Sequence, residues 1–231
     1  MSIYDIKDLN AVLGANSYPG RGIVIGKTAD GRHAAFAYFI MGRSENSRNR
    51  VFERTPDGIR TRAFDESKMT DPSLIIYHPV RRTERGLIVT NGDQTDTICE
   101  GHGFVAALRT RTFEPDAPNW TPRISGLAEP DGSYKLSILR SADPEGARCI
   151  RCFYEYEPEP GKARFLSTYE GFGSPLPSFS GEPVEVELPD CSARVLAERL
   201  WGSLDEANRV SLYVAAHGEE IIINKYEEAR R

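Results

Sequence analysis

Three arginines follow an apolar segment closely enough to converge on one ligand. Residues 34–41 are all apolar, and Arg43, Arg48 and Arg50 come directly after them. A guanidinium group can donate two parallel hydrogen bonds to a phosphate, so clustered arginines suit a small phosphorylated molecule. The alternative is a solvated loop, because runs of charge usually cover exposed faces.

A second polar cluster, residues 90–97, contains only polar residues and glycine. Asn91, Asp93 and Thr95 carry an amide, a carboxylate and a hydroxyl, which together supply hydrogen-bond donors and acceptors. Recognition of a purine-like carboxamide needs both, so we expect these three residues to bind substrate. The same composition also suits a plain turn followed by a helix cap.

The third cluster spans residues 113–124, a loop stiffened by prolines. Glu114 and Arg123 flank this loop, directly before a predicted strand. An ordinary surface connection would have the same composition, so the residues alone leave both interpretations open.

The four cysteines do not favour a metal or redox centre. Cys149 and Cys152 form the one close pair, and neither cysteine nor histidine lies near Cys191 to supply a second pair of zinc ligands. We expect Cys149 and Cys152 to face one side of a strand over residues 148–156, and we expect no metal.

Composition and charge limit the partners. The formal net charge of −5 argues against a nucleic-acid partner, because backbone phosphates require a basic surface. Basic residues are nevertheless concentrated between Arg43 and Arg85, which predicts one local anion-binding site. The chain has no apolar run of the roughly 18 residues that a membrane span needs, and its first residues do not resemble a signal peptide. We therefore expect a cytoplasmic protein without a membrane partner; the oligomeric state stays open, a homo-oligomer included.

Patterning predicts an α+β protein built mostly from hairpins. Short β-branched or apolar runs separated by turn residues predict strand pairs at 21–27 with 34–41, 73–77 with 86–90, and 123–127 with 134–139. Further strands are predicted at 149–156 and 219–225. Helical spacing predicts helices at 103–109, 190–201 and 203–213. Antiparallel hairpins covered by a few helices form a layered domain, and we expect one domain over residues 1–231.

The clusters, taken in order, resemble archaeal-type IMP cyclohydrolases over about residues 20–170. Each motif is weak alone, but their order and combination are fairly specific. The matching segments are a loop ending at Asn49-Arg50, Ile76-Tyr77, the block 90–98, Glu114, the Thr-Pro-Arg-Ile motif at 121–124, and the Ser-Thr-Tyr-Glu motif at 167–170.

The resemblance implies a fold, a reaction and a set of residues. The fold would be a four-layer αββα sandwich with mostly antiparallel sheets, resembling N-terminal-nucleophile hydrolases. The reaction would be the dehydrative ring closure of 5-formamidoimidazole-4-carboxamide ribotide (FAICAR) to IMP, with a small purine nucleotide as partner and no cofactor. Arg50, Tyr77 and Glu114 would be catalytic, and Arg43 and Arg123 are candidates for the 5′-phosphate. The arginine loop is slightly longer than the family pattern, so Arg48 is an alternative to Arg50.

Two other functions remain open. An N-terminal-nucleophile amide hydrolase would use Ser2 after loss of Met1, but about eighteen residues separate Ser2 from the first predicted strand. A non-catalytic purine-nucleotide-binding protein of the same fold would keep the pocket and lose the reaction.

Overall fold

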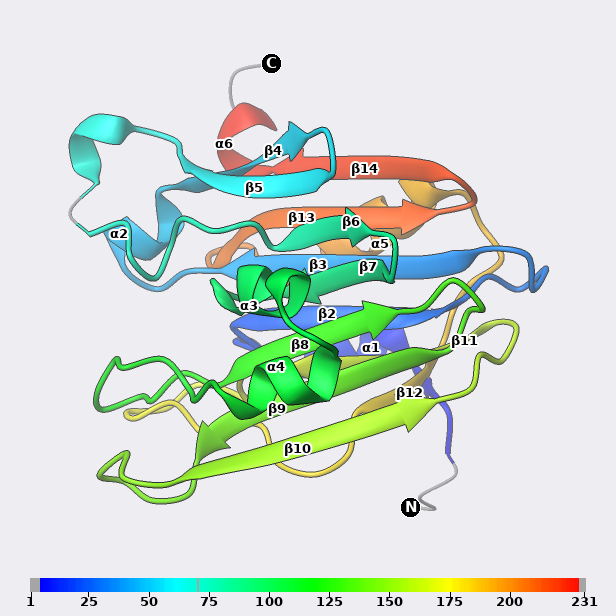
Figure 1. The fold of residues 1–231 in the computed structure, drawn as a ribbon. Helices are drawn as coiled ribbons and strands as arrows, with labels where there is room; N and C mark the ends of the chain where they lie inside the picture. The colour runs from blue at the N-terminus through cyan, green and yellow to red at the C-terminus, as the bar shows by residue number, and fades with distance from the viewer. Residues whose placement is uncertain (1–4, 70, 229–231) are drawn as a thin grey trace.

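The computed structural model describes residues 5–69 and 71–228. Its strands form two seven-stranded sheets, antiparallel throughout except for the short parallel pair β1 and β12 (Figure 1). The first sheet contains, in spatial order, β1 (Lys7–Asp8), β12 (Val184–Glu187), β11 (Lys162–Ser167), β2 (Arg21–Lys27), β3 (Ala34–Met41), β13 (Arg209–Ala216) and β14 (Glu219–Asn224). The second contains β10 (Cys149–Tyr156), β9 (Tyr134–Ser141), β8 (Arg123–Ala128), β7 (Gly86–Thr90), β6 (Val80–Thr83), β5 (Gly58–Ala63) and β4 (Arg50–Thr55).

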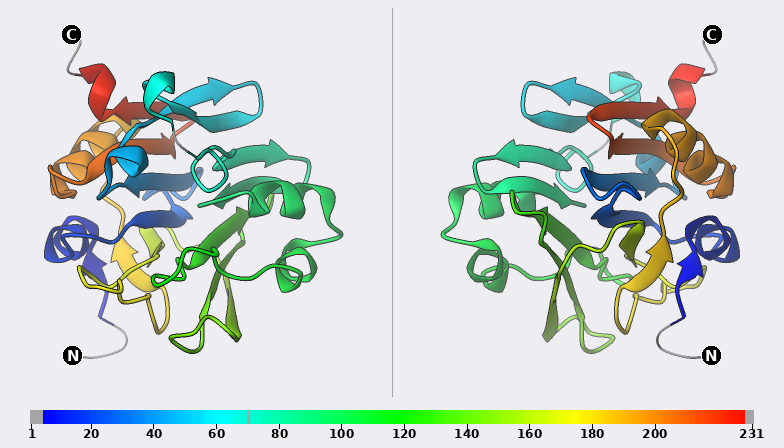
Figure 2. Two further views of the ribbon diagram at one scale, coloured as in Figure 1. Left: turned by 90° about the vertical axis from the view of Figure 1, so that its left-hand side faces the viewer. Right: turned by 90° about the vertical axis from the view of Figure 1, so that its right-hand side faces the viewer.

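Helices cover the outer face of each sheet, so that the molecule has four layers (Figure 2). Helices α1 (Leu9–Ala15) and α5 (Ala193–Ser203) pack on the first sheet. Helices α3 (Gln94–Glu100) and α4 (Phe104–Arg109) pack on the second. The short helices α2 (Glu45–Arg48), η1 (Glu66–Lys68) and α6 (Lys225–Glu228) lie in connections or at the end of the described chain.

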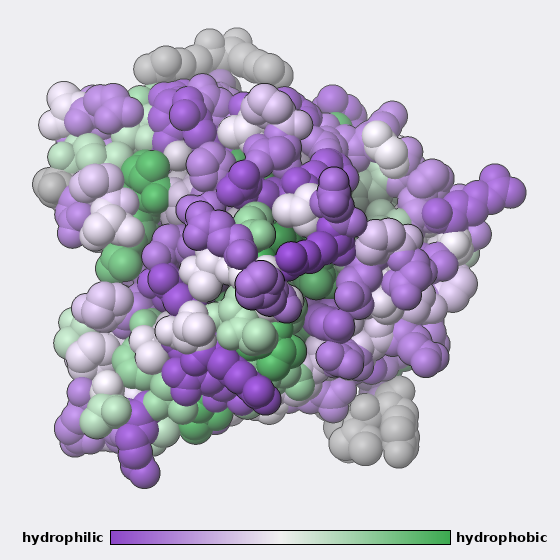
Figure 3. Space-filling view, in the orientation of Figure 1, coloured by the Kyte–Doolittle hydropathy of each residue, from purple (hydrophilic) through white to green (hydrophobic). Residues whose placement is uncertain are grey.

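The alternation of side chains along each strand lets one strand contribute to two hydrophobic cores. Among the described residues there are three such cores, one between the sheets and one between each sheet and its helices. In β2, Val24 packs against α1 and α5, whereas Ile23 and Ile25 point into the core between the sheets. Gly126 on β8 allows the sheets to approach there, because a Cβ atom would lie 2.4 Å from Cδ1 of Ile25. On the outer face of the second sheet, hydrophilic residues predominate and hydrophobic ones show through in small patches (Figure 3).

Most predicted elements are present. The hairpins of β2 with β3 and β8 with β9, the strands β10 and β14, and the helices α4 and α5 all form where patterning predicts them. The α+β class with mostly antiparallel sheets is thereby confirmed. The hairpin of β4 and β5 was not predicted, because its two strands contain four arginines and no long apolar run.

Two predicted elements are wrong. Residues 73–77 form no strand; β7 pairs instead with β6, and a turn in which the amide of Ile75 donates to the Pro72 carbonyl replaces the ladder. The predicted helix at 203–213 does not form. Helix α5 ends at Ser203, a turn follows in which Asp205 accepts hydrogen bonds from the backbone and the side chain of Asn208, and β13 begins at Arg209. Strand β13 is buried on both faces, so its apolar run does not alternate.

The expectation that Cys149 and Cys152 share one face of a strand is also wrong. Residues three apart in a strand point to opposite faces, so Cys149 packs under α3 and α4, whereas Cys152 packs between the sheets. Among the described residues, no helix has the length and apolar character needed to cross a membrane.

Candidate active site

Buried polar side chains gather at one end of the two sheets, where β2, β4 and β8 begin and β3 and β7 end. Buried charges are rare in proteins unless they are paired or functional, so this end stands out from the apolar core. The buried residues at or beside this end include Arg21, Asn49, Arg50, Thr90, Asn91, Gln94, Thr95, Glu114, Thr121, Arg123 and Thr168.

Arg50 is fully buried at the start of β4. Its Nε donates to the Ser47 carbonyl at 2.8 Å and its Nη2 to the Met41 carbonyl at 3.4 Å. Its Nη1 is buried without a hydrogen-bond partner among the described residues. A buried guanidinium with an unused donor is suited to bind an oxygen atom of a ligand.

Arg48 is placed differently. Its Nε donates to the Gly42 carbonyl at 2.8 Å and its Nη2 to Oδ1 of Asn208 at 3.2 Å. Because these bonds tie Arg48 to the ends of β3 and β13, the geometry favours Arg50 as the arginine of the site.

Tyr77 lies in the irregular segment before β6, yet its position is fixed from two sides. Its backbone amide donates to Oγ1 of Thr61 at 2.8 Å, and its hydroxyl lies 2.8 Å from the hydroxyl of Tyr38 on β3. Burial, followed by the neighbouring Tyr77, raises the pKa of Tyr38 well above its usual value. The Tyr38 hydroxyl therefore stays protonated and forms a buried hydrogen bond with the Tyr77 hydroxyl.

Glu114 is 2 % exposed and begins a loop closed by the hydrogen bond from its amide to the Thr121 carbonyl, 2.9 Å. Burial raises the pKa of its carboxyl from 4.5 to about 7, although Arg21, Arg123 and Arg50 act in the opposite direction. A carboxyl group with such a pKa exchanges its proton near neutral pH, as a general acid or base must.

Arg21 is a member of this group that the sequence reasoning missed. It begins β2, and its Nε is buried with no hydrogen-bond partner within residues 5–69 and 71–228. Burial lowers the pKa of Arg21, but Glu114 and the neighbouring tyrosines outweigh burial and raise it above the usual value. Arg21 therefore stays cationic beside Glu114.

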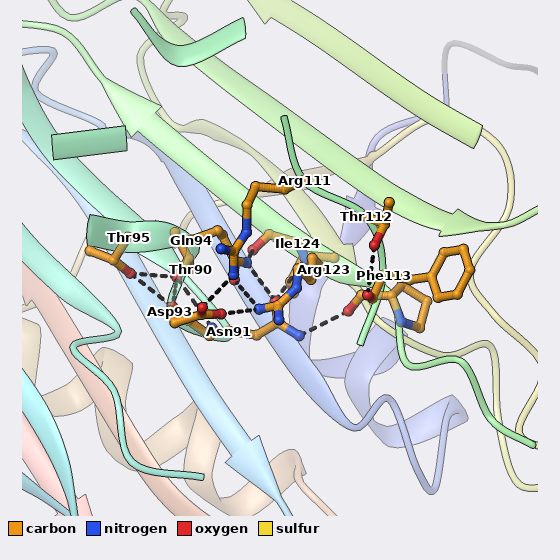
Figure 4. A network of polar contacts seen from close by, with 12 residues as sticks. Thr90, Asn91, Asp93, Gln94, Thr95, Arg111, Thr112, Phe113, Arg123 and Ile124 are labelled. Atoms are coloured by element: carbon orange, nitrogen blue, oxygen red, sulfur yellow. Dashed lines mark hydrogen bonds and ion pairs between the residues drawn. The ribbon is translucent and has the colours of Figure 1, made fainter. Parts of the chain in front are cut away.

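Asp93 and Arg123 belong to an ion-pair network at the N-terminus of α3 (Figure 4). Oδ1 of Asp93 lies 2.6 Å from Nη1 of Arg123, and Asp93 also pairs with Arg111. The same Arg123 nitrogen donates to Oε1 of Gln94 at 2.7 Å. Although partial burial acts to raise the pKa of Asp93, Arg111 and Arg123 lower it, so Asp93 is a carboxylate.

Asn91 and Thr95 use their hydrogen-bonding groups within the protein. Oδ1 of Asn91 accepts from the Ile124 amide at 2.8 Å, and its Nδ2 donates to the Pro122 carbonyl at 2.9 Å. Oγ1 of Thr95 lies 2.5 Å from that of Thr90 (Figure 4). Both residues join the end of β7 to its neighbours rather than project a free polar group.

Arg43 lies at the rim. It is exposed, its Nη1 donates to the Gly173 carbonyl at 3.2 Å, and its guanidinium lies 5.3 Å from the ring centre of Tyr18. Tyr18 in turn stacks on Tyr169, whose hydroxyl lies 2.5 Å from Oγ1 of Thr121.

One narrow cavity is lined by four of the predicted residues, Tyr77, Asp93, Glu114 and Arg123. Gly92, and Ser73 and Leu74 of the segment before β6, complete its lining. Arg50 lies within electrostatic reach of Tyr77 and Arg21. The cavity contains about 150 Å³ of empty space, its opening to solvent included, so a nucleotide does not fit in this conformation. The three residues expected to be catalytic thus meet at one end of the molecule.

Sequence reasoning also missed Tyr38 and Gln94. Tyr38 lies in an apolar strand and resembles any core aromatic, and Gln94 belongs to a run that suits a helix start. One weak indication in the sequence suggested that Arg21 belongs to the site, namely a single charge directly before a β-branched run.

The fold and the site together define an α+β protein with two stacked antiparallel sheets and a buried acid-base site at one end of them. The model of the family described as "IMP cyclohydrolase-like protein" matches residues 18–220, and the chain belongs to this family.

Curated relatives agree with the family. The chain is 29 % identical over 161 residues to the IMP cyclohydrolase of Methanococcus aeolicus, covering 66 % of this chain and 74 % of that protein. It is 28 % identical over 182 residues to the IMP cyclohydrolase of Methanopyrus kandleri, covering 70 % and 89 %. With the IMP cyclohydrolase of Halobacterium salinarum the identity is 30 % over 132 residues, 54 % and 63 % of the two chains.

Proposed function

We propose that this chain is an IMP cyclohydrolase, which closes the second ring of a purine nucleotide by converting FAICAR to IMP with loss of water. One observation carries the proposal: a buried carboxyl group, Glu114, has a pKa of about 7 and shares a cavity with Tyr77 and Arg123. The nature of this site fits the activity named for the family's archaeal members.

The reaction needs little more than positioning and proton transfer. The carboxamide nitrogen and the formyl carbon are carried by neighbouring ring atoms, so ring closure is intramolecular and depends on holding a reactive rotamer. The substrate is neither oxidised nor reduced, so no redox cofactor is needed, and side chains can supply the proton transfers.

Glu114 is the proposed base. As the carboxamide nitrogen forms a bond to the formyl carbon, it loses a proton, which the Glu114 carboxylate accepts. Once Tyr77 has protonated the former formyl oxygen, the Glu114 carboxyl gives it a second proton and it leaves as water. The formamido nitrogen forms the C=N bond and passes its proton to the Tyr77 oxygen, so both side chains return to their starting state. A base with a pKa near the working pH combines a useful ionised fraction with adequate basicity.

Tyr77 and Arg50 are proposed to act on the formyl oxygen. Tyr77 donates a proton to this oxygen as negative charge develops on it, and the Tyr38 hydroxyl 2.8 Å away holds Tyr77 in place. The unused Nη1 of Arg50 donates a further hydrogen bond to the same developing charge.

The remaining predicted residues are assigned by their contacts. Arg123 and the exposed Arg43 are the proposed contacts of the 5′-phosphate. Asn91 and Thr95 hold the loop after β7 in the conformation that presents Asp93. Since the cavity is smaller than a nucleotide needs, the wall formed by Ser73 and Leu74 must move when the substrate binds.

The helix–sheet–sheet–helix order supports a relation to N-terminal-nucleophile hydrolases, and we propose that residues 1–231 form one such domain. In those enzymes the nucleophile starts a strand at the chain's own amino end. Here an internal residue, Arg21, starts β2 at the site, which supports a cyclohydrolase rather than an amide hydrolase. Ser2 lies outside the described residues.

The test is to incubate purified protein with FAICAR and measure IMP. We expect Tyr77→Phe and Glu114→Gln to lower kcat by about 10²- to 10⁴-fold, the usual contribution of an acid-base group. Tyr134→Phe, at the end of β9 away from the site, and Glu198→Gln, on α5, are matched controls that retain activity. A folded protein that binds IMP but forms none from FAICAR is a non-catalytic binder. Loss of activity in Ser2→Ala, with activity retained in Tyr77→Phe and Glu114→Gln, would favour the amide hydrolase.

A further inference from the structure

Two neighbouring hairpin turns bring histidines together far from the cavity. Residues 28–33 join β2 to β3, and His217 with Gly218 joins β13 to β14. Strands β3 and β13 are paired, with Phe36 opposite Ala215, so this register places His33 beside the turn that carries His217. The two turns lie together on the right in Figure 1.

Three potential metal ligands meet at these turns. One donor atom from each of Asp30, His33 and His217 lies within 4.8 Å of the others, the one such group of three found among the described residues. The imidazole centres are 5.7 Å apart and their planes are inclined by 58°, so the rings are not stacked face to face. Small side-chain rotations bring donor atoms at this separation to the roughly 2.0–2.2 Å from a common centre that zinc requires.

The carboxylate is held in position by the turn itself. Oδ1 of Asp30 accepts hydrogen bonds from Oγ1 of Thr28 at 2.5 Å and from the Arg32 amide at 3.0 Å. Its other oxygen, Oδ2, accepts no hydrogen bond from any described residue and is available to a metal ion.

We propose that Asp30, His33 and His217 bind one divalent transition-metal ion, with zinc as the expected occupant. Two imidazoles and one carboxylate are a donor set that zinc accepts, with water in the fourth position, and Asp30 and His33 are exposed to solvent. The bound ion links the β2–β3 turn to the β13–β14 turn.

This metal site is separate from the cavity and does not depend on the proposed function. Arg21 and Lys27 are at opposite ends of β2, and at about 3.3 Å per residue the strand is about 20 Å long. The expected effect of the ion is thermal stabilisation, because a ligand that binds the folded state alone raises Tm.

The experiment is equilibrium dialysis of untagged, chelator-treated protein against ZnCl₂, with Tm measured in parallel. We expect saturation at one zinc per chain and a Tm that rises with zinc concentration. His33→Gln, His217→Asn and Asp30→Asn each lower zinc affinity at least tenfold, the loss that removal of even an outer partner of a metal ligand causes. Asn is chosen at position 217 because φ there is +52°, a conformation that Asn tolerates.

His78→Gln and His102→Gln are controls, since these histidines lie outside the cluster, and both should bind zinc like the wild type. Circular dichroism without zinc verifies that each variant folds. The proposal is overturned by the absence of saturable binding, or by zinc binding that survives unchanged in His217→Asn, which would indicate the half-buried cysteines instead.

Discussion

Glu114 makes the sharpest prediction, because its protonation connects stability and activity. The unfolded chain releases this proton near the usual pKa of 4.5, whereas the folded protein retains it up to about 7. Between these values the folded state binds more protons than the unfolded state, so the free energy of unfolding falls as pH rises. The stabilising contribution is complete below pH 4.5 and is lost as pH passes 7.

The magnitude follows from the shift. One pKa unit corresponds to about 1.4 kcal/mol. The rise from 4.5 to about 7 therefore costs the wild type about 3 kcal/mol of stability between pH 4.5 and pH 8. In a chain of this length that equals a Tm change of roughly 6 to 12 °C.

Glu114→Gln places a permanently neutral amide where the protonated carboxyl lies. We expect urea denaturation to show that the free energy of unfolding of this variant does not fall by this amount between pH 5 and pH 8. Its conversion of FAICAR should be nearly abolished. Glu198→Gln on the exposed face of α5 should retain both the pH dependence and the activity of the wild type. Glu114→Gln and the wild type differ in this one titrating group, and the Glu198→Gln control shows what loss of an exposed glutamate does, so the comparison isolates Glu114.

In the wild type, kcat should increase about tenfold per pH unit below 7 and level off above it, since the base must be ionised. If Glu114→Gln keeps the wild-type dependence of stability on pH, the assignment of the raised pKa to this carboxyl is wrong. If the variant keeps its activity, Glu114 is not the base.

Three further predictions concern the surrounding residues. Tyr38→Phe should lower kcat about tenfold, the value of one hydrogen bond, and less than Tyr77→Phe does; equal losses would mean that Tyr38 itself contacts the substrate. Arg50→Lys should lower kcat about 10²- to 10³-fold while Arg48→Lys leaves it near the wild-type value, and the reverse order in steady-state assays would identify Arg48 as the active-site arginine. Asn91→Ala should lower the free energy of unfolding in urea by about 1–3 kcal/mol, because the Ile124 amide and Pro122 carbonyl lose their partner; unchanged stability would contradict its structural role.

The sequence pattern was sufficient to predict an element wherever its apolar residues are bounded by turn or cap residues. The β2–β3 hairpin has two apolar strands around a turn that is mostly polar and contains a glycine. Helix α5 has a Ser192 cap followed by apolar residues at helical spacing. Pattern failed at β13, where burial on both faces removes alternation, and at residues 73–77, whose apolar run meets a turn and the Thr61 side chain instead of a strand.

The sequence by itself determined the residue types of the site, their order along the chain, the family and the α+β class. The tertiary structure alone decided which groups meet: Arg21 lies beside Glu114, Tyr38 beside Tyr77, and Arg50 rather than Arg48 carries an unused buried donor. The physical reason is that burial, and with it the pKa of Glu114, depends on two sheets closing over residues far apart in the chain. Local propensity reports the conformation of each strand, but it contains no information about what packs against its face.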